Sequence, residues 1–288
     1  MGAADVVPGV SGGTMALILG IYQRLINAIK SFDFEWLRSI FRFDIKNIFG
    51  RPHFAFLVPL LLGIFIAILF FTRVVPLPLL IKTHPEQIYG LFFGLIGGSI
   101  MVLLYDIKQL SIRDIVAMVL GVVIGLIIFT LVPTDTPEAS WFVFISGAVA
   151  ICAMILPGIS GSFVLLILKK YAYVLNGIGH FDFTVIIPFG LGAITGLVLF
   201  SRALSWLLDR YYRITLLFIV GLLIASLWVI WPFQHRTYVA MRGKEYLVGT
   251  TPVLPDSVSG DVLQALVMGI LGVIVVIVIH WLAQRDRA

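Results

Sequence analysis

The chain has 288 residues, of which 60% are hydrophobic and only 12% are charged, and its mean hydropathy is +1.07. About a quarter of the residues of a soluble domain are charged, so this composition excludes a soluble globular protein and indicates an integral membrane protein. The formal net charge of +5 comes from basic residues scattered over expected loops, which is typical of membrane-surface flanks and not of a nucleic-acid-binding patch.

The first element is an apolar stretch, residues 2–21, interrupted by the block Pro8-Gly9-Val10-Ser11-Gly12-Gly13. Proline and glycine break helices, and a broken helix at membrane depth is tolerated only where it is buried in protein or lines a cavity. We therefore expect a re-entrant or discontinuous helix here, continuing as a helical run over residues 14–19. The apolar start has no basic leader, so no cleavable signal peptide is expected.

An amphipathic segment follows at residues 35–53. Its apolar positions recur at helical spacing and are Trp36, Leu37, Ile40, Phe41, Ile45, Ile48 and Phe49. Arg38, Arg42 and Lys46 lie four residues apart on another face. This pattern predicts an amphipathic helix lying on an anionic cytoplasmic leaflet. A helix packed on the protein's own surface fits the pattern equally well.

Six continuous apolar runs have the length that a membrane-spanning helix needs, about 20 residues. They occupy residues 54–71, 88–105, 115–132, 185–208, 214–231 and 262–282. A second broken element, residues 141–168, lies between the third and fourth runs. We therefore predict an all-α integral membrane protein in which each half of the chain has one broken element and three transmembrane helices.

The one long polar stretch, residues 232–261, contains three prolines and several glycines, so it is expected to form an extended or hairpin loop outside the membrane. The single cysteine, Cys152, excludes an intramolecular disulfide. The sequence has no Cys/His cluster with metal-ligand spacing, so neither a metal nor a cofactor is expected.

The two halves are repeats of each other. The second broken element carries the block Pro157-Gly158-Ile159-Ser160-Gly161-Ser162, which matches the first block at an offset of 149 residues. The same offset aligns Tyr22 with Tyr171, Asn27 with Asn176, and residues 32–34 with 181–183; an offset of 129 then aligns Pro59 with Pro188 and Gly63 with Gly192. The fall of 20 residues identifies the amphipathic segment as an insertion. We predict one membrane domain, with a first repeat at 1–132 and a second at 133–288.

Topology depends on whether the broken elements turn back or span the membrane. If they turn back, each half crosses three times and the halves are inverted; if they span, the halves are parallel. Lys and Arg divide 13 to 7 between the two sides under either model, so charge places residues 22–53 in the cytoplasm without choosing between them. The short apolar stretch before Pro8 favours the inverted arrangement, although residues 141–156 are long enough to cross most of a bilayer.

The two blocks have the character of anion-binding turns. Ser11 and Ser160 occupy N-cap positions, and the backbone N–H groups that follow them are expected to be unpaired donors at the positive end of a helix dipole. Small side chains let an anion approach that backbone, and paired breaks in two repeats point to a transporter's substrate site. Two tight structural turns are the alternative. The candidate phosphate ligands are Ser11, Gly12, Gly13, Thr14, Ser160, Gly161 and Ser162.

Arg73 and Arg202 form a second repeat-matched pair. Arg202 lies well inside an apolar run, where a charged side chain is costly and marks a functional site, and a guanidinium holds phosphate through two parallel hydrogen bonds. An arginine that extends to the lipid headgroups is the alternative, and it fits Arg73 almost as well. Asp5 has no acidic repeat partner, because Met154 stands there, and it is a candidate for ion or proton coupling or for an ion pair with arginine.

The residues GAADVVPGVSGGTMALILGIYQRL and LPGISGSFVLLIL closely resemble the PopT-type polyprenyl-phosphate translocases of bacteria. The resemblance covers nearly the whole chain. It implies a flippase of the bacterial cytoplasmic membrane that returns undecaprenyl phosphate to the cytoplasmic leaflet for reuse in cell-envelope synthesis. It extends to the two turns; the roles of the arginines are inferred from the residues themselves.

Two other functions compete with this one. Undecaprenyl-pyrophosphate phosphatases also have repeated halves and a re-entrant turn, but Gly12 and Gly161 stand where that family has arginine, and the acidic cluster of such a hydrolase is missing. A small-anion channel or carrier also aims helix ends at its ion. A cavity that opens sideways to lipid would favour the lipid transporter.

Overall fold

The structure is a computed structural model of the chain that describes residues 1–7, 10–105, 107, 109–241, 244–255 and 260–285. In chain order its helices are α1 (Gly2–Asp5), α2 (Gly12–Ile18), α3 (Tyr22–Lys30), α4 (Phe34–Phe41), α5 (Ile45–Gly50), α6 (Phe54–Leu69), the π-helix η1 (Phe70–Val74), α7 (Leu77–Thr83), α8 (Pro85–Tyr105), α9 (Ile112–Thr130), α10 (Ser140–Ile155), α11 (Gly161–Ile167), α12 (Tyr171–Gly179), α13 (Phe183–Arg210), α14 (Tyr212–Val229) and α15 (Gly260–Arg285). Strands β1 (Gln234–Met241) and β2 (Lys244–Pro252) lie between α14 and α15.

All six predicted spans are helices long and apolar enough to cross a membrane. In the part of the chain that is described, they are Phe54–Val74, Pro85–Tyr105, Ile112–Thr130, Phe183–Arg210, Tyr212–Val229 and Gly260–Leu282. The chain is therefore a multi-pass membrane protein. The helices α11 and α12 would add a seventh span if they crossed together, but they meet at an angle of 109°.

The polar stretch before α15 is the exception to an all-helical fold. Strands β1 and β2 form a two-stranded antiparallel sheet in which Gln234 pairs with Pro252 and Met241 with Lys244. A hairpin is one of the two forms expected for this stretch, and the all-α description needs this correction. A hairpin forms here because threonine, tyrosine and valine are concentrated in residues 234–252, and these residue types favour strands.

The element boundaries repeat as the sequence does. Helices α11 and α12 begin and end 149 residues after α2 and α3, and α13 begins 129 residues after α6. The left-handed backbone recurs as well, since Gly20 has a φ of 67° and its counterpart Lys169 has a φ of 50°. The halves differ where α13 continues unbroken. Its counterpart in the first half ends at η1, because Pro76 stands opposite Ser205 and a proline cannot continue the hydrogen-bonded helix.

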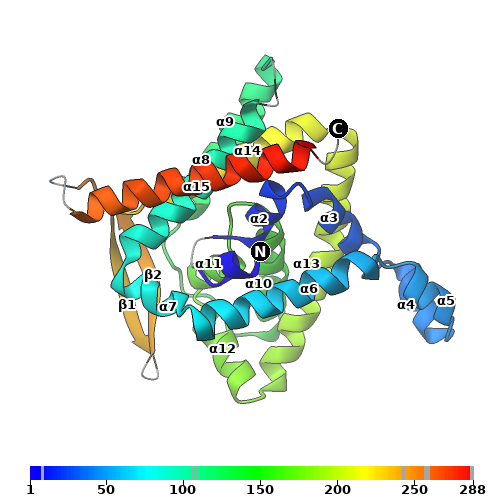
Figure 1. Cartoon of the computed structure of the whole chain (residues 1–288). Helices are drawn as coiled ribbons and strands as arrows, with labels where there is room; N and C mark the ends of the chain where they lie inside the picture. Colours follow the sequence, from blue (N-terminus) through cyan, green and yellow to red (C-terminus); the bar gives the residue numbers. More distant parts are fainter. Residues whose placement is uncertain (8–9, 106, 108, 242–243, 256–259, 286–288) are drawn as a thin grey trace. The chain divides into compact units, whose positions relative to one another are not determined.

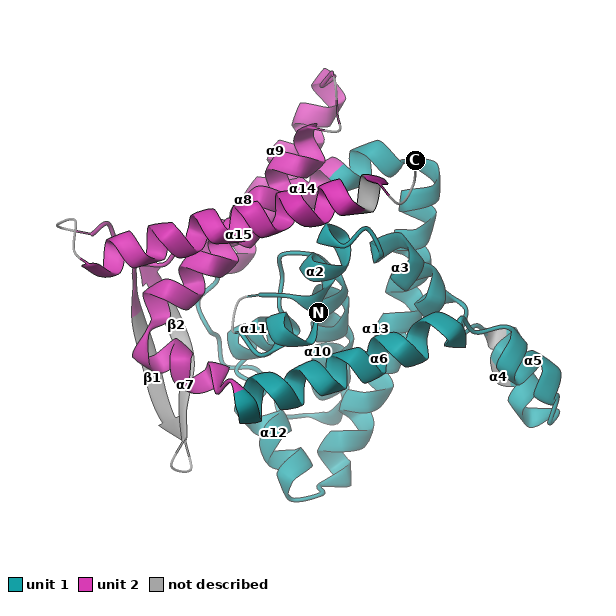
Figure 2. Ribbon diagram, in the orientation of Figure 1, with its two compact units in different colours: residues 1–74, 131–216 teal, residues 75–130, 217–288 magenta. Residues whose placement is uncertain are grey.

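The chain forms two compact units, and each draws on both halves of the sequence (Figure 2). Unit 1 comprises residues 1–74 and 131–216, which contain both broken elements and the first long helix of each half. Unit 2 comprises residues 75–130 and 217–288, which contain the other four spans and the β-hairpin. The two turns singled out in the sequence therefore belong to the same unit.

Within unit 2, helices α8 and α15 pack along their length through small residues. Gly90 and Gly94 of α8 lie so close to Ala265 and Gly269 of α15 that a Cβ atom on either glycine would collide with the partner's backbone. Small residues spaced four apart let membrane helices approach closely and gain van der Waals contact. An almost wholly apolar cavity of about 410 Å³ lies beside this contact, and Phe93 is one of the residues that line it.

Unit 1 offers a matched test of helix packing. A Cβ atom at Gly192 of α13 would collide with the Phe144 carbonyl oxygen of α10, whereas at its repeat counterpart Gly63 it would meet no described atom within 4 Å. Gly192→Ala is therefore expected to destabilise the protein by about 1–3 kcal/mol through overpacking, and Gly63→Ala is expected to be nearly neutral. Thermal unfolding of both variants in detergent measures the difference. Equal melting temperatures would show that α10 and α13 are not packed in this way.

Candidate anion-binding site

The first turn leads into α2 through a satisfied N-cap. Ser11 has extended backbone, with φ −116° and ψ 135°, and its Oγ accepts a hydrogen bond of 3.1 Å from the Gly13 N–H. The Gly12 N–H donates to Asp5 Oδ1 at 2.9 Å. The predicted N-cap is confirmed, but the prediction of free donors at Gly12, Gly13 and Thr14 is wrong, since the Thr14 N–H also bonds the Ser11 carbonyl. Pro8 and Gly9 lie outside the described residues.

The acid that fills this turn comes from the chain itself. Asp5 ends α1, and its carboxylate is held at the N-terminus of α2. A negative group is favoured there because the helix dipole has its positive end at the N-terminus and the first N–H groups of a helix need an acceptor from outside the helix. No ion pair between Asp5 and an arginine is present in the described part of the chain, so that alternative receives no support. The first turn carries its own anion.

The second turn has the same backbone plan but no acid. Gly158 has a φ of 90°, which explains the need for glycine, and Ser160 is the N-cap of α11 with φ −102° and ψ 133°. Met154 stands where the first half has Asp5. Among the described residues, no acceptor faces the N–H groups of Gly161 and Ser162. The backbone N–H groups of Gly161 and Ser162 are therefore free donors in this turn.

The hydroxyls of the second turn are also available. The Oγ atoms of Ser160 and Ser162 lie 2.8 Å apart, and Ser160 forms no capping bond of the kind that Ser11 forms. Ser162 is exposed and Ser160 half-buried, whereas Ser11 is buried in the first turn. Two hydroxyls and two backbone N–H groups thus lie together at the start of α11, and groups of this kind are donors suited to an anion such as phosphate.

The structure brings the two turns together (Figure 1). The Gly158 N–H donates to Thr14 Oγ1 at 2.9 Å, and Ser11 Oγ donates to the Met154 carbonyl at 3.3 Å. A Cβ atom at Gly13 would lie 2.8 Å from the Ile155 carbonyl oxygen, so only glycine permits this approach. The first turn has its donors occupied, in part by Asp5, and its contacts fix the position of the second turn.

The far end of α11 is held by the segment before α10. The Thr134 N–H donates to the Ile167 carbonyl at 3.0 Å, and Thr136 Oγ1 donates to the Leu168 carbonyl at 2.6 Å. These bonds satisfy carbonyls that a helix end leaves unpaired. They also hold the segment before α10 at the end of α11, and α10 and α11 pack against each other, so α10, the turn and α11 form a hairpin.

Lys170 is a buried cation that the sequence did not reveal. Its residue is 2% exposed, its Nζ donates to the Thr136 carbonyl at 2.8 Å, and the ring of Tyr173 lies 5.3 Å from it. A carbonyl and aromatic faces replace water around the ammonium. Two adjacent lysines after an apolar run are typical of a membrane flank, so the sequence alone gives no signal for this burial. Lys170 anchors the loop before α10 to the bend that follows α11.

A polar network joins α3 to α13. Ser205 is buried, and its Oγ accepts from Lys30 Nζ at 2.9 Å and lies 3.2 Å from Asn27 Oδ1. Asp209 Oδ2 lies 3.3 Å from the same hydroxyl. The repeat counterparts of Lys30 and Ser205 are Gly179 and Pro76, which cannot form such a network. The repeat therefore does not duplicate this polar network.

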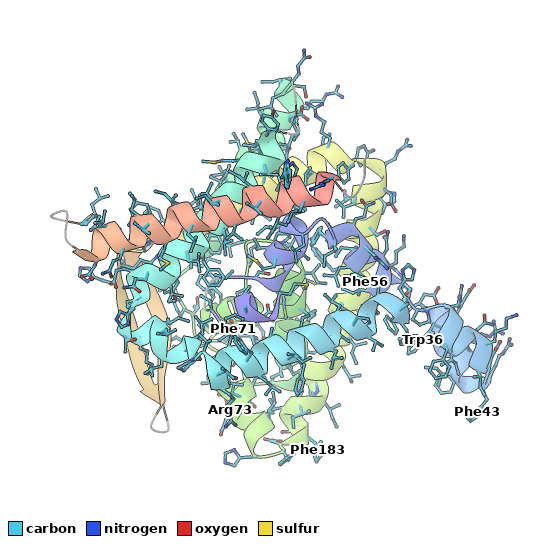
Figure 3. The ribbon with its side chains drawn as sticks, in the orientation of Figure 1. Trp36, Phe43, Phe56, Phe71, Arg73 and Phe183 are labelled. Carbon is cyan, nitrogen blue, oxygen red and sulfur yellow. The ribbon has the colours of Figure 1, made fainter. Side chains whose placement is uncertain are left out.

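The two predicted arginines do not contact the turns. Arg73 lies in η1 at the end of α6 and is exposed (Figure 3), and Arg202 is half-buried within α13. In the described residues neither guanidinium forms an ion pair or a hydrogen bond. Arg24 is another cation of unit 1, and its guanidinium stacks on the ring of Phe56 at 4.5 Å. Both members of the arginine pair belong to unit 1 and remain free to bind an anion.

Comparison with known proteins identifies the family. A family model described as undecaprenyl phosphate translocase-like matches residues 1–246. A polyprenyl-phosphate transporter of Vibrio cholerae is 41% identical over 235 residues, covering 82% of this chain and 76% of the relative. A polyprenyl-phosphate transporter of Staphylococcus aureus is 30% identical over 253 residues, covering 81% and 83%. No solved structure matches the chain.

The family match extends across both turns and most of the spans, and the comparisons distinguish between two of the functions that the sequence left open. The family and its relatives are transporters, so a phosphatase of the same lipid pathway is excluded. The chain belongs to the undecaprenyl phosphate translocase-like family of membrane transporters.

Proposed function

We propose that this protein is a flippase that carries undecaprenyl phosphate from the outer to the cytoplasmic leaflet of the bacterial cytoplasmic membrane, where the lipid is reused in cell-envelope synthesis. Both relatives are named polyprenyl-phosphate transporters, and the chain covers most of each. The observation in the structure that carries the proposal is the second turn, which offers accessible donors without an acid beside them.

The phosphate binds at Ser160, Gly161 and Ser162 in this proposal. Coulomb repulsion from the Asp5 carboxylate disfavours the first turn, since a phosphate carries at least one negative charge and the donors there are already in use. Ser11, Gly12, Gly13 and Thr14 therefore serve the site by fixing the position of the second turn. They bind phosphate directly only if Asp5 moves away from Gly12.

The helix end alone does not supply enough positive charge. The end of a helix corresponds to about half an elementary charge, and a phosphate carries one to two negative charges. Arg202 and Arg73 supply the positive charge that the helix end lacks. They do so as the transporter moves between its outward-open and inward-open states. The polyprenyl tail stays in the lipid phase throughout, because transferring it into water would be unfavourable.

Inverted halves are the arrangement that we propose for transport. The hydrogen bonds between the segment before α10 and the end of α11 support a re-entrant hairpin in the second half. Three crossings per half then give opposite orientations, and movement of one half against the other alternates access to the site. In this arrangement residues 22–53 lie in the cytoplasm, and residues 169–184 and 232–261 lie on the opposite side of the membrane.

Direct measurement of lipid flipping tests the function. The purified protein is reconstituted in liposomes that contain a fluorescent polyprenyl phosphate or a fluorescent phospholipid, and a membrane-impermeant quencher reports the outer leaflet. Fluorescence of lipid in the inner leaflet is protected from the quencher. This protected fluorescence is expected to fall rapidly for the polyprenyl phosphate and not for the phospholipid. Flipping of unrelated phospholipids at the same rate would contradict the proposed substrate.

A further inference from the structure

The insertion in the first half is a helical hairpin rather than the single amphipathic helix that the sequence predicted. Helices α4 and α5 are separated at residues 42–44, where Phe43 adopts a left-handed φ of 53°. The Asp44 carboxylate then caps α5 by accepting from the Asn47 N–H at 3.2 Å and from Asn47 Nδ2 at 2.7 Å. These two bonds hold the pKa of Asp44 below its ordinary value, so the cap is charged at neutral pH.

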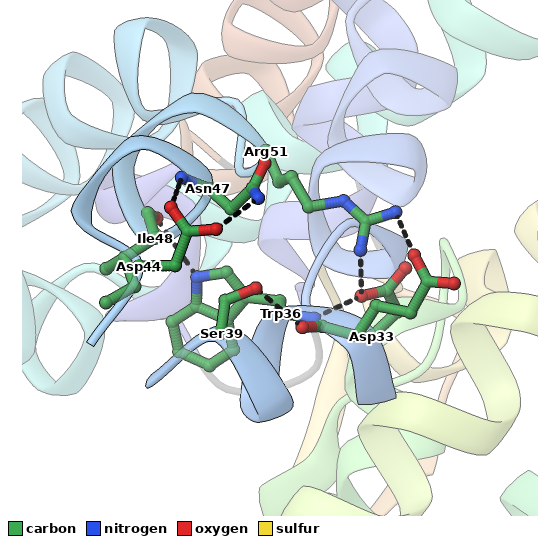
Figure 4. Close-up of polar contacts among 8 residues, drawn as sticks. Asp33, Trp36, Ser39, Asp44, Asn47, Ile48 and Arg51 are labelled. Atoms are coloured by element: carbon green, nitrogen blue, oxygen red, sulfur yellow. Dashed lines mark hydrogen bonds and ion pairs between the residues drawn. The ribbon is translucent and has the colours of Figure 1, made fainter. Parts of the chain in front are cut away.

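The hairpin is held together by its own polar contacts (Figure 4). The Trp36 Nε1–H of α4 donates to the Ile48 carbonyl of α5 at 3.1 Å, and the Trp36 backbone N–H donates to Asp33 Oδ1 at 2.7 Å. Arg51 pairs with Asp33 and Glu35 across the base. These contacts link α4 to α5 and close the base of the hairpin.

Its large apolar side chains nevertheless point away from the chain. Phe41 is 76% exposed, Phe43 86%, Ile45 69% and Phe49 68%. Phe43 lies at the outer end of the hairpin, beyond the body of unit 1 (Figure 3). Clustered exposed aromatic groups of this kind mark an interaction surface. Packing on the protein's own surface, the alternative that the sequence left open, would have buried them.

The hairpin also carries unpaired positive charge. Its acids are occupied, since Glu35 pairs with Arg51 and Asp44 caps α5. Arg38, Arg42 and Lys46 are exposed and form no ion pair in the described part of the chain. Three free cations beside exposed aromatic groups complement a surface that is negative at its headgroups and apolar beneath them.

We propose that the α4–α5 hairpin docks on anionic lipid headgroups of the leaflet in which α6 begins. Only residues 51–53 separate α5 from α6, and three residues reach at most about 11 Å, so the hairpin cannot leave the membrane surface. Phe49 and Phe54 are in contact, with ring centroids 6.0 Å apart, which continues the apolar face of the hairpin into the span. The hairpin thus anchors α3 and α6 of unit 1 to the headgroup layer.

Depth-dependent quenching in the full-length protein tests this docking. Phe41→Cys in a Cys152→Ser background is labelled with an environment-sensitive fluorophore and reconstituted in phosphatidylcholine with or without phosphatidylglycerol. With the anionic lipid, a spin label near the top of the acyl chain is expected to quench the fluorophore at least about twofold more than in phosphatidylcholine alone. The additional substitutions Arg38→Gln, Arg42→Gln and Lys46→Gln should remove this difference.

The control substitutions are Arg113→Gln and Arg210→Gln, which remove exposed charges outside the hairpin and should leave the quenching unchanged. Melting temperatures show whether each variant is folded. Equal quenching in both lipids would overturn the role of anionic headgroups. Quenching by aqueous iodide alone, in both lipids, would overturn membrane docking and leave the hairpin free for a soluble partner.

Discussion

Replacing both serines of the second turn, Ser160→Ala/Ser162→Ala, is expected to slow polyprenyl-phosphate flipping by at least about tenfold. Each hydroxyl would donate to a charged phosphate oxygen, and a hydrogen bond to a charged group contributes about 1.5–3 kcal/mol. In the described structure the two hydroxyls form a hydrogen bond with each other and with no third residue. The protein should therefore remain folded without them. Flipping rates over a range of lipid concentrations measure the loss.

Ser11→Ala is the matched control for this double substitution. Ser11 occupies the repeat-equivalent N-cap, but its hydroxyl is used inside the protein by Gly13 and Met154. Its loss should lower stability by about 1 kcal/mol and change the flipping rate by less than about threefold. If Ser11→Ala impaired flipping more than the double substitution did, the first turn and not the second would be the phosphate site.

Arg202→Ala is expected to abolish transport without unfolding the protein. Its guanidinium is half-buried in an apolar helix and has no ion-pair partner in the described residues, so its removal breaks no structural bond but takes away a full positive charge. Arg202→Lys should also impair transport, because a point charge cannot form the two parallel hydrogen bonds that a guanidinium forms with phosphate. Flipping assays and melting temperatures together measure both effects.

Substitutions of Arg73, which is exposed, and of Arg24, which stacks on Phe56, are expected to have smaller effects on flipping. Arg73→Ala should reduce flipping less than Arg202→Ala does, and Arg24→Ala should have the smallest effect, since Arg24 is engaged with Phe56. Normal flipping by a well-folded Arg73→Ala/Arg202→Ala protein would show that the arginine pair does not hold the phosphate. Arg24 or the turn alone would then have to neutralise it.

The long-range organisation of the fold could be predicted from the sequence because it follows from composition and repetition. All six spans are apolar runs of sufficient length, and the offset of 149 that aligns the blocks also aligns the helices on either side of Gly20 and Lys169. Helix breaks at Pro and Gly are local effects, so the two turns and both N-caps were also predictable.

The state of the donors within the turns could not be predicted. Both blocks have the same backbone chemistry, and the difference between them comes from Asp5, which lies seven residues before the Gly12 that it contacts. Met154 at the matching position was visible in the sequence, but not the direction in which Asp5 would point. Burial of Lys170 likewise depends on tertiary packing rather than on the residue's own preference.

Photo-crosslinking of the substrate tests the central claim most directly. A short polyprenyl phosphate with a photoreactive group beside the phosphate is activated with the purified protein in liposomes, and the labelled peptides are mapped by mass spectrometry. The label is expected on residues 157–163, to be displaced by unlabelled polyprenyl phosphate and to be lost in Ser160→Ala/Ser162→Ala. Displaceable labelling confined to residues 5–14, or to unit 2, with none at 157–163, would contradict a phosphate site at the second turn.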